Sequence, residues 1–209
     1  MTADVAFWDN IAERYAAKPV DDPAAFDRKT DIIRGLLSPD HALLDVGCGT
    51  GSLALRLAPS AREVHGLDVS REMIRIARGK ATASGAANAT FHVGALGADA
   101  PFAPGMFDVV CACSLLHLVA DRADALAHLF RLLKPGGAFV ASTVCLGESW
   151  VPYAPILTVM RWVGKAPRVQ VFPKRTLVDD ITRAGFVDLT QPDVGAAATI
   201  GFMVARRPR

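Results

Sequence analysis

The 209-residue sequence lacks a long apolar run and a block of charge of one sign, although 51% of its side chains are apolar. Its longest uninterrupted apolar run extends only from Val109 to Cys113, whereas a membrane-spanning helix needs about 20 apolar residues. The N-terminus has no basic segment followed by an apolar one, which a secretory signal requires. With 23 Lys and Arg against 21 Asp and Glu, the chain attracts nucleic acid weakly. These absences predict a cytoplasmic protein with no transmembrane segment and no nucleic-acid partner.

Cysteine is also scarce, since the chain has only four. Cys48 lies in a glycine-rich segment, and Cys111, Cys113 and Cys145 lie in apolar runs. No second cysteine pair and no histidine pair accompanies them at the spacing of metal ligands. We therefore expect buried, reduced thiols and no metal site.

Short apolar runs alternate with helical patterns along the chain. The predicted strands are Ala42–Val46, Val64–Leu67, Thr90–Val93, Phe107–Cys113, Ala138–Val144, Phe186–Leu189 and Thr199–Ala205. The predicted helices between them are Ser52–Ala58, Arg71–Ser84, Arg122–Leu133 and Lys174–Ala184. Strands that alternate with helices form a parallel sheet covered on both faces, which explains why these strands are continuous apolar runs. The expected fold is α/β, with a doubly wound seven-stranded sheet.

Two further helical patterns precede the first strand. The first places Trp8 and Tyr15 on one face, and the second covers about Pro23–Leu37. Both helices are expected either to pack on the edge of the sheet or, for the first, to close over a pocket at the strand ends.

The most informative segment is a glycine loop, Asp45-Val-Gly-Cys-Gly-Thr-Gly51, between a strand and a helix. Glycines let a ligand approach the backbone, and free N–H groups at the helix start are expected to face it. Asp68, at the end of the next strand, can accept both hydroxyls of an adenosine ribose. A dinucleotide fingerprint needs glycine where this chain has Ser52. The charge of Asp45 opposes a pyrophosphate but suits the ammonium and sulfonium of S-adenosylmethionine, which we therefore expect in preference to NAD.

At these residues the sequence resembles the class I S-adenosylmethionine-dependent methyltransferases, in particular the small-molecule group that includes the ubiquinone and menaquinone methyltransferases. Leu67-Asp68-Val-Ser, Ser114-Leu-Leu-His-Leu118 and Arg131-Leu-Leu-Lys-Pro-Gly-Gly137 resemble later motifs of that family. The resemblance implies a Rossmann-like sheet whose last strand is antiparallel and inserted beside the fifth. In one departure, Gly94-Ala95-Leu96 stands where the family usually has an Asp for the adenine amino group. That leaves the backbone near Leu96, or Asp99, to contact the adenine.

The resemblance also implies a site in which a methyl group passes by in-line displacement to a small, apolar or aromatic acceptor. The residues expected to bind the cofactor are Tyr15, Asp45, Gly47, Cys48, Gly49, Thr50, Gly51, Asp68, Val69, Met73, Ala95, Leu96 and Ser114. His117 is the candidate base, which is needed only if the acceptor must lose a proton. The alternative interpretation is that His117 only packs or forms a hydrogen bond at the start of a helix. S-adenosylhomocysteine would be the product, and no metal is expected.

The segment from Gly147 to Gly164 concentrates two of the three Trp and is followed by Lys165 and Arg168. It is interpreted as a lid helix, as an apolar acceptor pocket, or as an interfacial face with its basic flank near lipid headgroups. Alternative functions are a phospholipid N-methyltransferase at a membrane surface and a methyltransferase-like protein that binds the cofactor without turnover. We expect one domain, made of N-terminal cap helices (1–38), a cofactor-binding core (39–146), a substrate lid (147–173) and the C-terminal part of the sheet (174–209).

Overall fold

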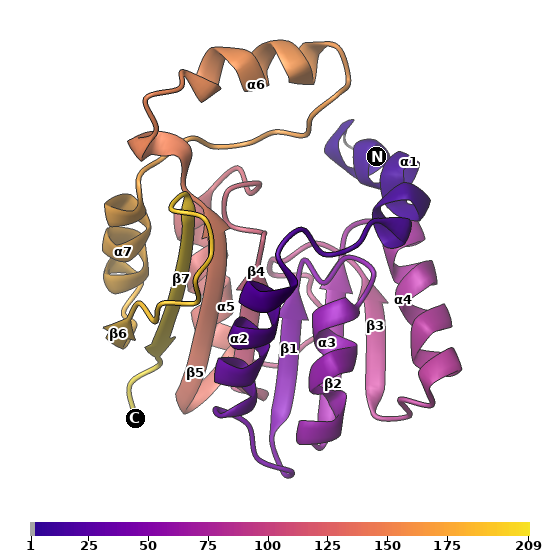
Figure 1. Cartoon of the computed structure of the whole chain (residues 1–209). Coiled ribbons are helices and arrows are strands. Elements are labelled where there is room, and N and C mark those ends of the chain that lie inside the picture. Colours follow the sequence, from indigo (N-terminus) through magenta and orange to yellow (C-terminus); the bar gives the residue numbers. More distant parts are fainter. Residues whose placement is uncertain (1–2) are drawn as a thin grey trace.

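The computed structural model describes residues 3–209, which form one mixed sheet of seven strands covered by helices (Figure 1). The strands are β1 (Ala42–Val46), β2 (Glu63–Asp68), β3 (Ala89–Val93), β4 (Phe107–Cys113), β5 (Leu133–Val144), β6 (Val187–Thr190) and β7 (Ile200–Arg206). Their order across the sheet is β3-β2-β1-β4-β5-β7-β6. β7 pairs antiparallel with β5 and β6, and the other neighbours pair in parallel. The expected topology, with the last strand reversed and inserted beside the fifth, is confirmed.

Seven α-helices connect or flank the described strands. They are α1 (Ala3–Ala17), α2 (Pro23–Arg34), α3 (Ser52–Leu57), α4 (Arg71–Ser84), α5 (Arg122–Leu132), α6 (Tyr153–Trp162) and α7 (Lys174–Arg183), with short 3-10 turns η1 (Ala58–Ser60) and η2 (Leu146–Glu148). Side chains of Asp22, Ser70 and Asp121 begin α2, α4 and α5 by accepting a hydrogen bond from the N–H three residues later. Gly85, with φ 67°, ends α4. Polar caps therefore set these helix boundaries.

The fifth strand is longer than the sequence predicts. The predicted helix ends at Leu133 and the predicted strand begins at Ala138, which leaves Lys134–Gly137 as a turn between them. In the structure β5 begins at Leu133, which pairs with Phe107 of β4. The register shifts just after Phe107, so the four residues form a bulge inside the strand. The ammonium of Lys134 bonds both carboxylate oxygens of Asp108, at 2.8 and 2.9 Å, and holds this bulge against β4.

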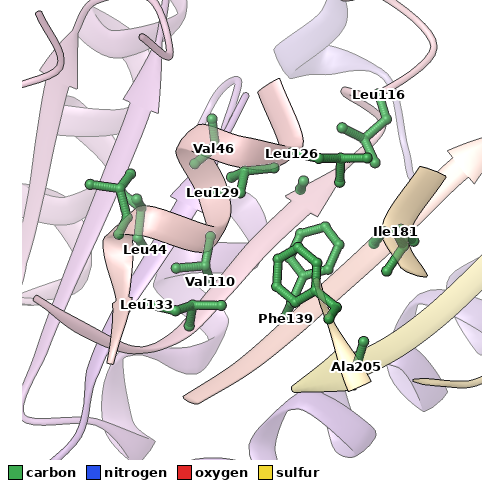
Figure 2. Close-up of a cluster of buried hydrophobic side chains, with 14 of the residues drawn as sticks. Leu44, Val46, Val110, Leu116, Leu126, Leu129, Leu133, Phe139, Ile181 and Ala205 are labelled. Atoms are coloured by element: carbon green, nitrogen blue, oxygen red, sulfur yellow. The ribbon is translucent and has the colours of Figure 1, made fainter. Parts of the chain in front are cut away.

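Buried side chains fill both faces of the sheet. Figure 2 shows the cluster that the sheet forms with α5 and α7. Its labelled members are Leu44, Val46, Val110, Leu116, Leu126, Leu129, Leu133, Phe139, Ile181 and Ala205. On the other face, Ile33 of α2, Leu57 of α3 and Ile74 of α4 pack on the strands. Since every residue of β1 is buried, double coverage accounts for its apolar sequence, which Asp45 alone interrupts.

The two N-terminal helices take different positions. α2 packs on the sheet through Ile33, whereas α1 lies beside α4 above the carboxyl ends of the parallel strands (Figure 1). Asp9 fixes α1 by accepting hydrogen bonds from the Ser70 hydroxyl at 2.6 Å and the Glu72 N–H at 3.2 Å. Of the two expected positions, α2 takes the one packed on the sheet, and α1 takes the one over the strand ends.

α6 stands above the same carboxyl edge, and none of its residues is fully buried (Figure 1). The chain after α6 returns to α1, where the Arg168 N–H donates to Asp4 at 3.0 Å and the Arg161 guanidinium lies 3.8 Å from the Asp4 carboxylate. Among residues 3–209, no helix combines the length and apolar character needed to cross a membrane.

Candidate functional site

The glycine loop joins β1 to α3 at the carboxyl edge of the sheet, and its own chain satisfies much of its backbone. The N–H groups of Gly47 and Cys48 donate to the Leu67 carbonyl at 2.7 and 3.2 Å. The Gly49 N–H donates to the Asp68 carboxylate at 2.9 Å. These three N–H groups therefore already have acceptors, which the Leu67 carbonyl and the Asp68 carboxylate at the end of β2 supply. The expectation of free N–H groups at the start of α3 stays a prediction.

All three glycines of the loop have positive φ, and Gly49 and Gly51 differ in what surrounds them. At Gly51, with φ 76°, an added Cβ would lie 2.8 Å from the Phe91 ring and 3.0 Å from the Cβ of Ala77. At Gly49, with φ 52°, the nearest atom to an added Cβ is a ring carbon of Tyr15 at 3.9 Å. Gly51 is thus required by packing, whereas Gly49 borders space beside α1.

Two carboxyl groups lie next to the loop. Asp45 is 2% exposed, and burial followed by the charge of Asp68 raises its pKa to about 7. The Asp68 carboxylate accepts the N–H groups of Gly49 and Ser70, each at 2.9 Å, while burial raises its pKa. Neighbouring acids disfavour each other's ionised form, and a cation relieves that cost. This part of the site therefore favours a positively charged ligand.

Residues expected around an adenosine differ in their exposure. Tyr15 of α1 is half-exposed, and partial burial followed by the charge of Asp68 raises its pKa. Val69 is exposed after β2, but Met73 is buried in the first turn of α4. After β3, Ala95 and Asp99 are exposed and Leu96 is half-buried.

Ser114, directly after β4, has an unusual backbone conformation for a residue other than glycine, with φ 58°. Its N–H donates to the Ser142 carbonyl at 2.6 Å. The next residue, Leu115, lies against the glycine loop, 3.1 Å from the position of a Cβ at Gly47. Such conformations cluster at functional sites, because the surrounding structure must hold them in place.

His117 lies in the same segment and is 8% exposed. Its carbonyl accepts the Gln170 N–H at 2.7 Å, which ties the segment to the chain after α6. Within residues 3–209, its buried Nδ1 has no hydrogen-bond partner. Burial lowers the pKa of the imidazole to about 4, so His117 is neutral at pH 7.

We expect His117 to make the protein sensitive to acid. As pH falls from 6.5 to about 4, the imidazole of the unfolded chain gains a proton and the folded one does not, so the free energy of unfolding decreases. This difference in pKa corresponds to about 3 kcal/mol. In urea unfolding at about pH 4.5 and about pH 7, His117→Leu should lose less stability in acid than the unaltered protein. His41→Leu is the control, and equal losses in all three proteins would contradict the interpretation.

The sequence does not reveal several contacts that organise this edge. Asp9 links α1 to α4, and the Lys80 ammonium donates to the Thr50 hydroxyl of the loop at 2.9 Å. Both contacts join residues at least 30 positions apart. Since no motif marks Asp9 or Lys80, only the fold reveals these two contacts.

The cysteines lie partly or fully buried and form no disulfide among the described residues. Burial raises the pKa of Cys48 and Cys111 well above its usual range and that of Cys113 to about 12. These thiols therefore stay protonated at pH 7 and are poor nucleophiles. The described chain also has no group of three or more His, Cys, Asp or Glu arranged to hold a metal ion.

The strand order, with a reversed β7 inserted beside β5, is the one that the resemblance to class I S-adenosylmethionine-dependent methyltransferases implies. A family model described as a methyltransferase domain matches residues 37–167, and the chain belongs to this family. Ubiquinone/menaquinone biosynthesis C-methyltransferase UbiE of Geotalea daltonii is 37% identical over 106 residues, which cover 49% of this chain and 45% of that protein.

Two solved structures are similar in fold. The YcgJ protein of Bacillus subtilis matches with a TM-score of 0.71 and 17% identity, over 88% of this chain and 99% of that one. Phosphoethanolamine N-methyltransferase 2 of Haemonchus contortus, in complex with S-adenosyl-L-methionine, matches with a TM-score of 0.74 and 16% identity. The match covers 88% of this chain and 53% of that one. The chain spans less than half the length of several curated relatives that it matches.

Proposed function

We propose that this protein transfers the methyl group of S-adenosylmethionine to a small apolar or aromatic acceptor. The observation that carries the proposal is the pair of carboxyl groups, Asp45 and Asp68, beside a glycine loop in which the N–H groups of Gly47, Cys48 and Gly49 already have partners. A pyrophosphate needs free donors and would meet two acids here. The ammonium and sulfonium of the methyl donor gain from the same charges.

The proposed cofactor contacts come from residues at the carboxyl edge of the sheet. Asp68 accepts the ribose hydroxyls, since each of its oxygens has a second lone pair besides the one used by the backbone. Asp45 compensates the positive charge of the methionine part, and the Ser114 carbonyl binds its ammonium end. The remaining contacts come from Tyr15, Gly47, Cys48, Gly49, Thr50, Gly51, Val69, Met73, Ala95 and Leu96.

The bound cofactor supplies a methyl group that its sulfonium already activates. The protein has to orient the two reactants and exclude water. Holding them close together in the reactive geometry raises the rate of transfer. We assign orientation to the glycine loop and screening to α1 and the segment after α6, which meet at Asp4. His117 is neutral at pH 7, so its imidazole can accept the proton that an acceptor loses, becoming a cation as the sulfonium gives up its methyl group and its positive charge.

We propose one domain in which residues 39–146 bind the cofactor and residues 1–38 and 147–173 select the acceptor, while residues 174–209 complete the sheet. Half-buried Tyr153 and Leu157 of α6 support an apolar preference. A screen of small aromatic and apolar compounds with labelled methyl donor identifies the acceptor. Transfer only to charged, hydrophilic compounds would contradict this preference.

A thermal shift series tests the cofactor. A ligand at about 100 times its Kd adds about 2.7 kcal/mol, and we expect this shift with S-adenosylmethionine and S-adenosylhomocysteine but not with NAD. Asp68→Ala should lose the shift, and so should Asp68→Asn, which keeps one acceptor oxygen for the loop. Asp108→Ala is the matched control, because its carboxylate also accepts a backbone N–H, that of Ala42 at 2.8 Å, but at the opposite end of the sheet. A shift with NAD alone would overturn the proposal.

His117→Ala separates binding from turnover. It should keep the shift with S-adenosylhomocysteine and lower the rate of methyl transfer to an acceptor that must lose a proton. If His117→Ala and Asp68→Ala lose the cofactor equally, His117 is not the base.

A further inference from the structure

α6 and its neighbours carry large apolar side chains that face solvent. Trp150 and Trp162 are 93% and 91% exposed. Four further side chains recur at the i, i+3, i+4, i+7 spacing of one helical face and are each at least 38% exposed. This outer stripe consists of Ile156, Val159, Met160 and Val163.

A second stripe on α6 turns toward the protein. Tyr153 and Leu157, one turn apart, are half-buried, and Arg161 continues their line to the Asp4 carboxylate. The Arg168 N–H bonds the same carboxylate and fixes the chain after the helix. Closure of α6 onto the sheet would cover the inner stripe and leave the outer stripe exposed.

The segment that carries the outer stripe has charged side chains of one sign only. Residues 149–178 contain five basic side chains and no acidic one, whereas the other 179 residues hold 18 Lys and Arg against 21 Asp and Glu. The five are Arg161, Lys165, Arg168, Lys174 and Arg175. An apolar stripe on a segment this rich in cations complements a surface that is apolar inside and anionic outside.

We propose that α6, with Trp150 and Trp162, docks on the surface of an anionic phospholipid bilayer. The outer stripe enters the interface, the Trp rings lie at the level of the headgroups, and the cations meet lipid phosphates. A second copy of the chain fits less well, since a symmetric contact through this patch sets the same cations against each other, and residues 149–178 hold no acid to pair them.

Docking places the carboxyl edge of the sheet next to lipid, because α6 stands above that edge (Figure 1). If the proposed function holds, an apolar acceptor dissolved in the bilayer reaches the site without crossing water. This consequence, unlike the docking itself, rests on the proposed function.

Cosedimentation with lipid vesicles tests the surface. We expect the full chain to bind vesicles of phosphatidylcholine with about one third phosphatidylglycerol, and to bind pure phosphatidylcholine at least about tenfold more weakly. Val159→Glu should weaken binding by about tenfold or more, because it places a charge in the outer stripe. Val187→Glu is the matched control, since Val187 is also exposed but lies on β6.

A second pair of variants tests the charges. Lys165→Glu with Arg175→Glu should weaken binding, whereas Arg62→Glu with Arg209→Glu changes the net charge equally at exposed sites elsewhere and should not. All variants should keep the thermal shift with S-adenosylhomocysteine, so failure of docking is distinguishable from failure of the proposed function. The proposal is overturned if the unaltered protein binds neither vesicle, or if each variant binds as its control does. A dimer that Val159→Glu dissociates, without vesicle binding, would assign the surface to a second copy.

Discussion

Replacing Asp45 with Asn is expected to abolish binding of S-adenosylmethionine and to make the ligand-free protein more stable. The Asp45 carboxyl has a pKa of about 7 in the folded protein against 3.8 for the unfolded chain. The folded state holds its proton longer, so stability falls as pH rises between these values. At about pH 8 the accumulated cost is about 4 kcal/mol, which a neutral Asn avoids.

Urea unfolding at about pH 5 and about pH 8 measures this effect, and the gain from Asp45→Asn should be larger at the higher pH. Asp108→Asn is the control with the opposite sign. Burial raises the pKa of Asp108, but bonds from Ala42 and Lys134 outweigh it and lower the pKa overall, so Asn should destabilise there. If Asp45→Asn binds the cofactor normally, or is less stable than the unaltered protein at pH 8, the interpretation of Asp45 is wrong.

The same carboxyl makes cofactor affinity depend on pH. A cationic ligand favours ionised Asp45, so binding releases a proton when it occurs below pH 7. Affinity for S-adenosylmethionine should therefore rise as pH increases through 7. Calorimetry in two buffers of different ionisation enthalpy detects the proton.

Gly51→Ala is expected to lower the free energy of unfolding by about 2–5 kcal/mol. The left-handed conformation costs a residue with a Cβ about 1–2 kcal/mol. The new methyl group would also lie 2.8 Å from the Phe91 ring and 3.0 Å from Ala77, and overpacking of this kind costs about 1–3 kcal/mol. Chemical denaturation of the purified variant measures the sum.

Gly49→Ala is the matched comparison in the same loop. It has a positive φ too, but its nearest neighbour is the Tyr15 ring at 3.9 Å, so only the conformational cost of about 1–2 kcal/mol applies. The methyl group would instead enter the space that we assign to the cofactor. Gly49→Ala should stay folded and lose the shift with S-adenosylhomocysteine. Equal destabilisation of the two variants, or a full shift in Gly49→Ala, would contradict this division of roles.

His117 and Asp45 oppose each other in mild acid. Between pH 6.5 and about 4, loss of stability through His117 coincides with a gain through Asp45. The unaltered protein should therefore show a flatter pH profile than either single variant. This compensation arises because both groups are buried in the same folded protein, where their pKa values shift in opposite directions.

The features that the sequence predicted are those that depend on residues close together along the chain. The apolar runs of β1 and β4 marked buried parallel strands, and the helical pattern over Arg71–Ser84 marked α4. The Lys134–Gly137 segment misled, because Pro and Gly signal a turn even when an ion pair to Asp108 holds them within a strand. The bonded N–H groups of the glycine loop also escaped prediction, since their acceptors lie about 20 residues away.

The position of β7 constrains how the chain folds. It is the last strand of the described sheet in sequence, yet it separates β5 from β6. While the chain emerges from the ribosome, β5 therefore keeps an open edge, including Phe139 and Val140, until Ala205 and Val204 arrive to pair with them. An unpaired apolar edge is a template for other chains, so the interval before β7 emerges carries the greatest risk of aggregation. Loss of this one strand would open two edges in the middle of the sheet, and β6 would have no partner to hold it in place.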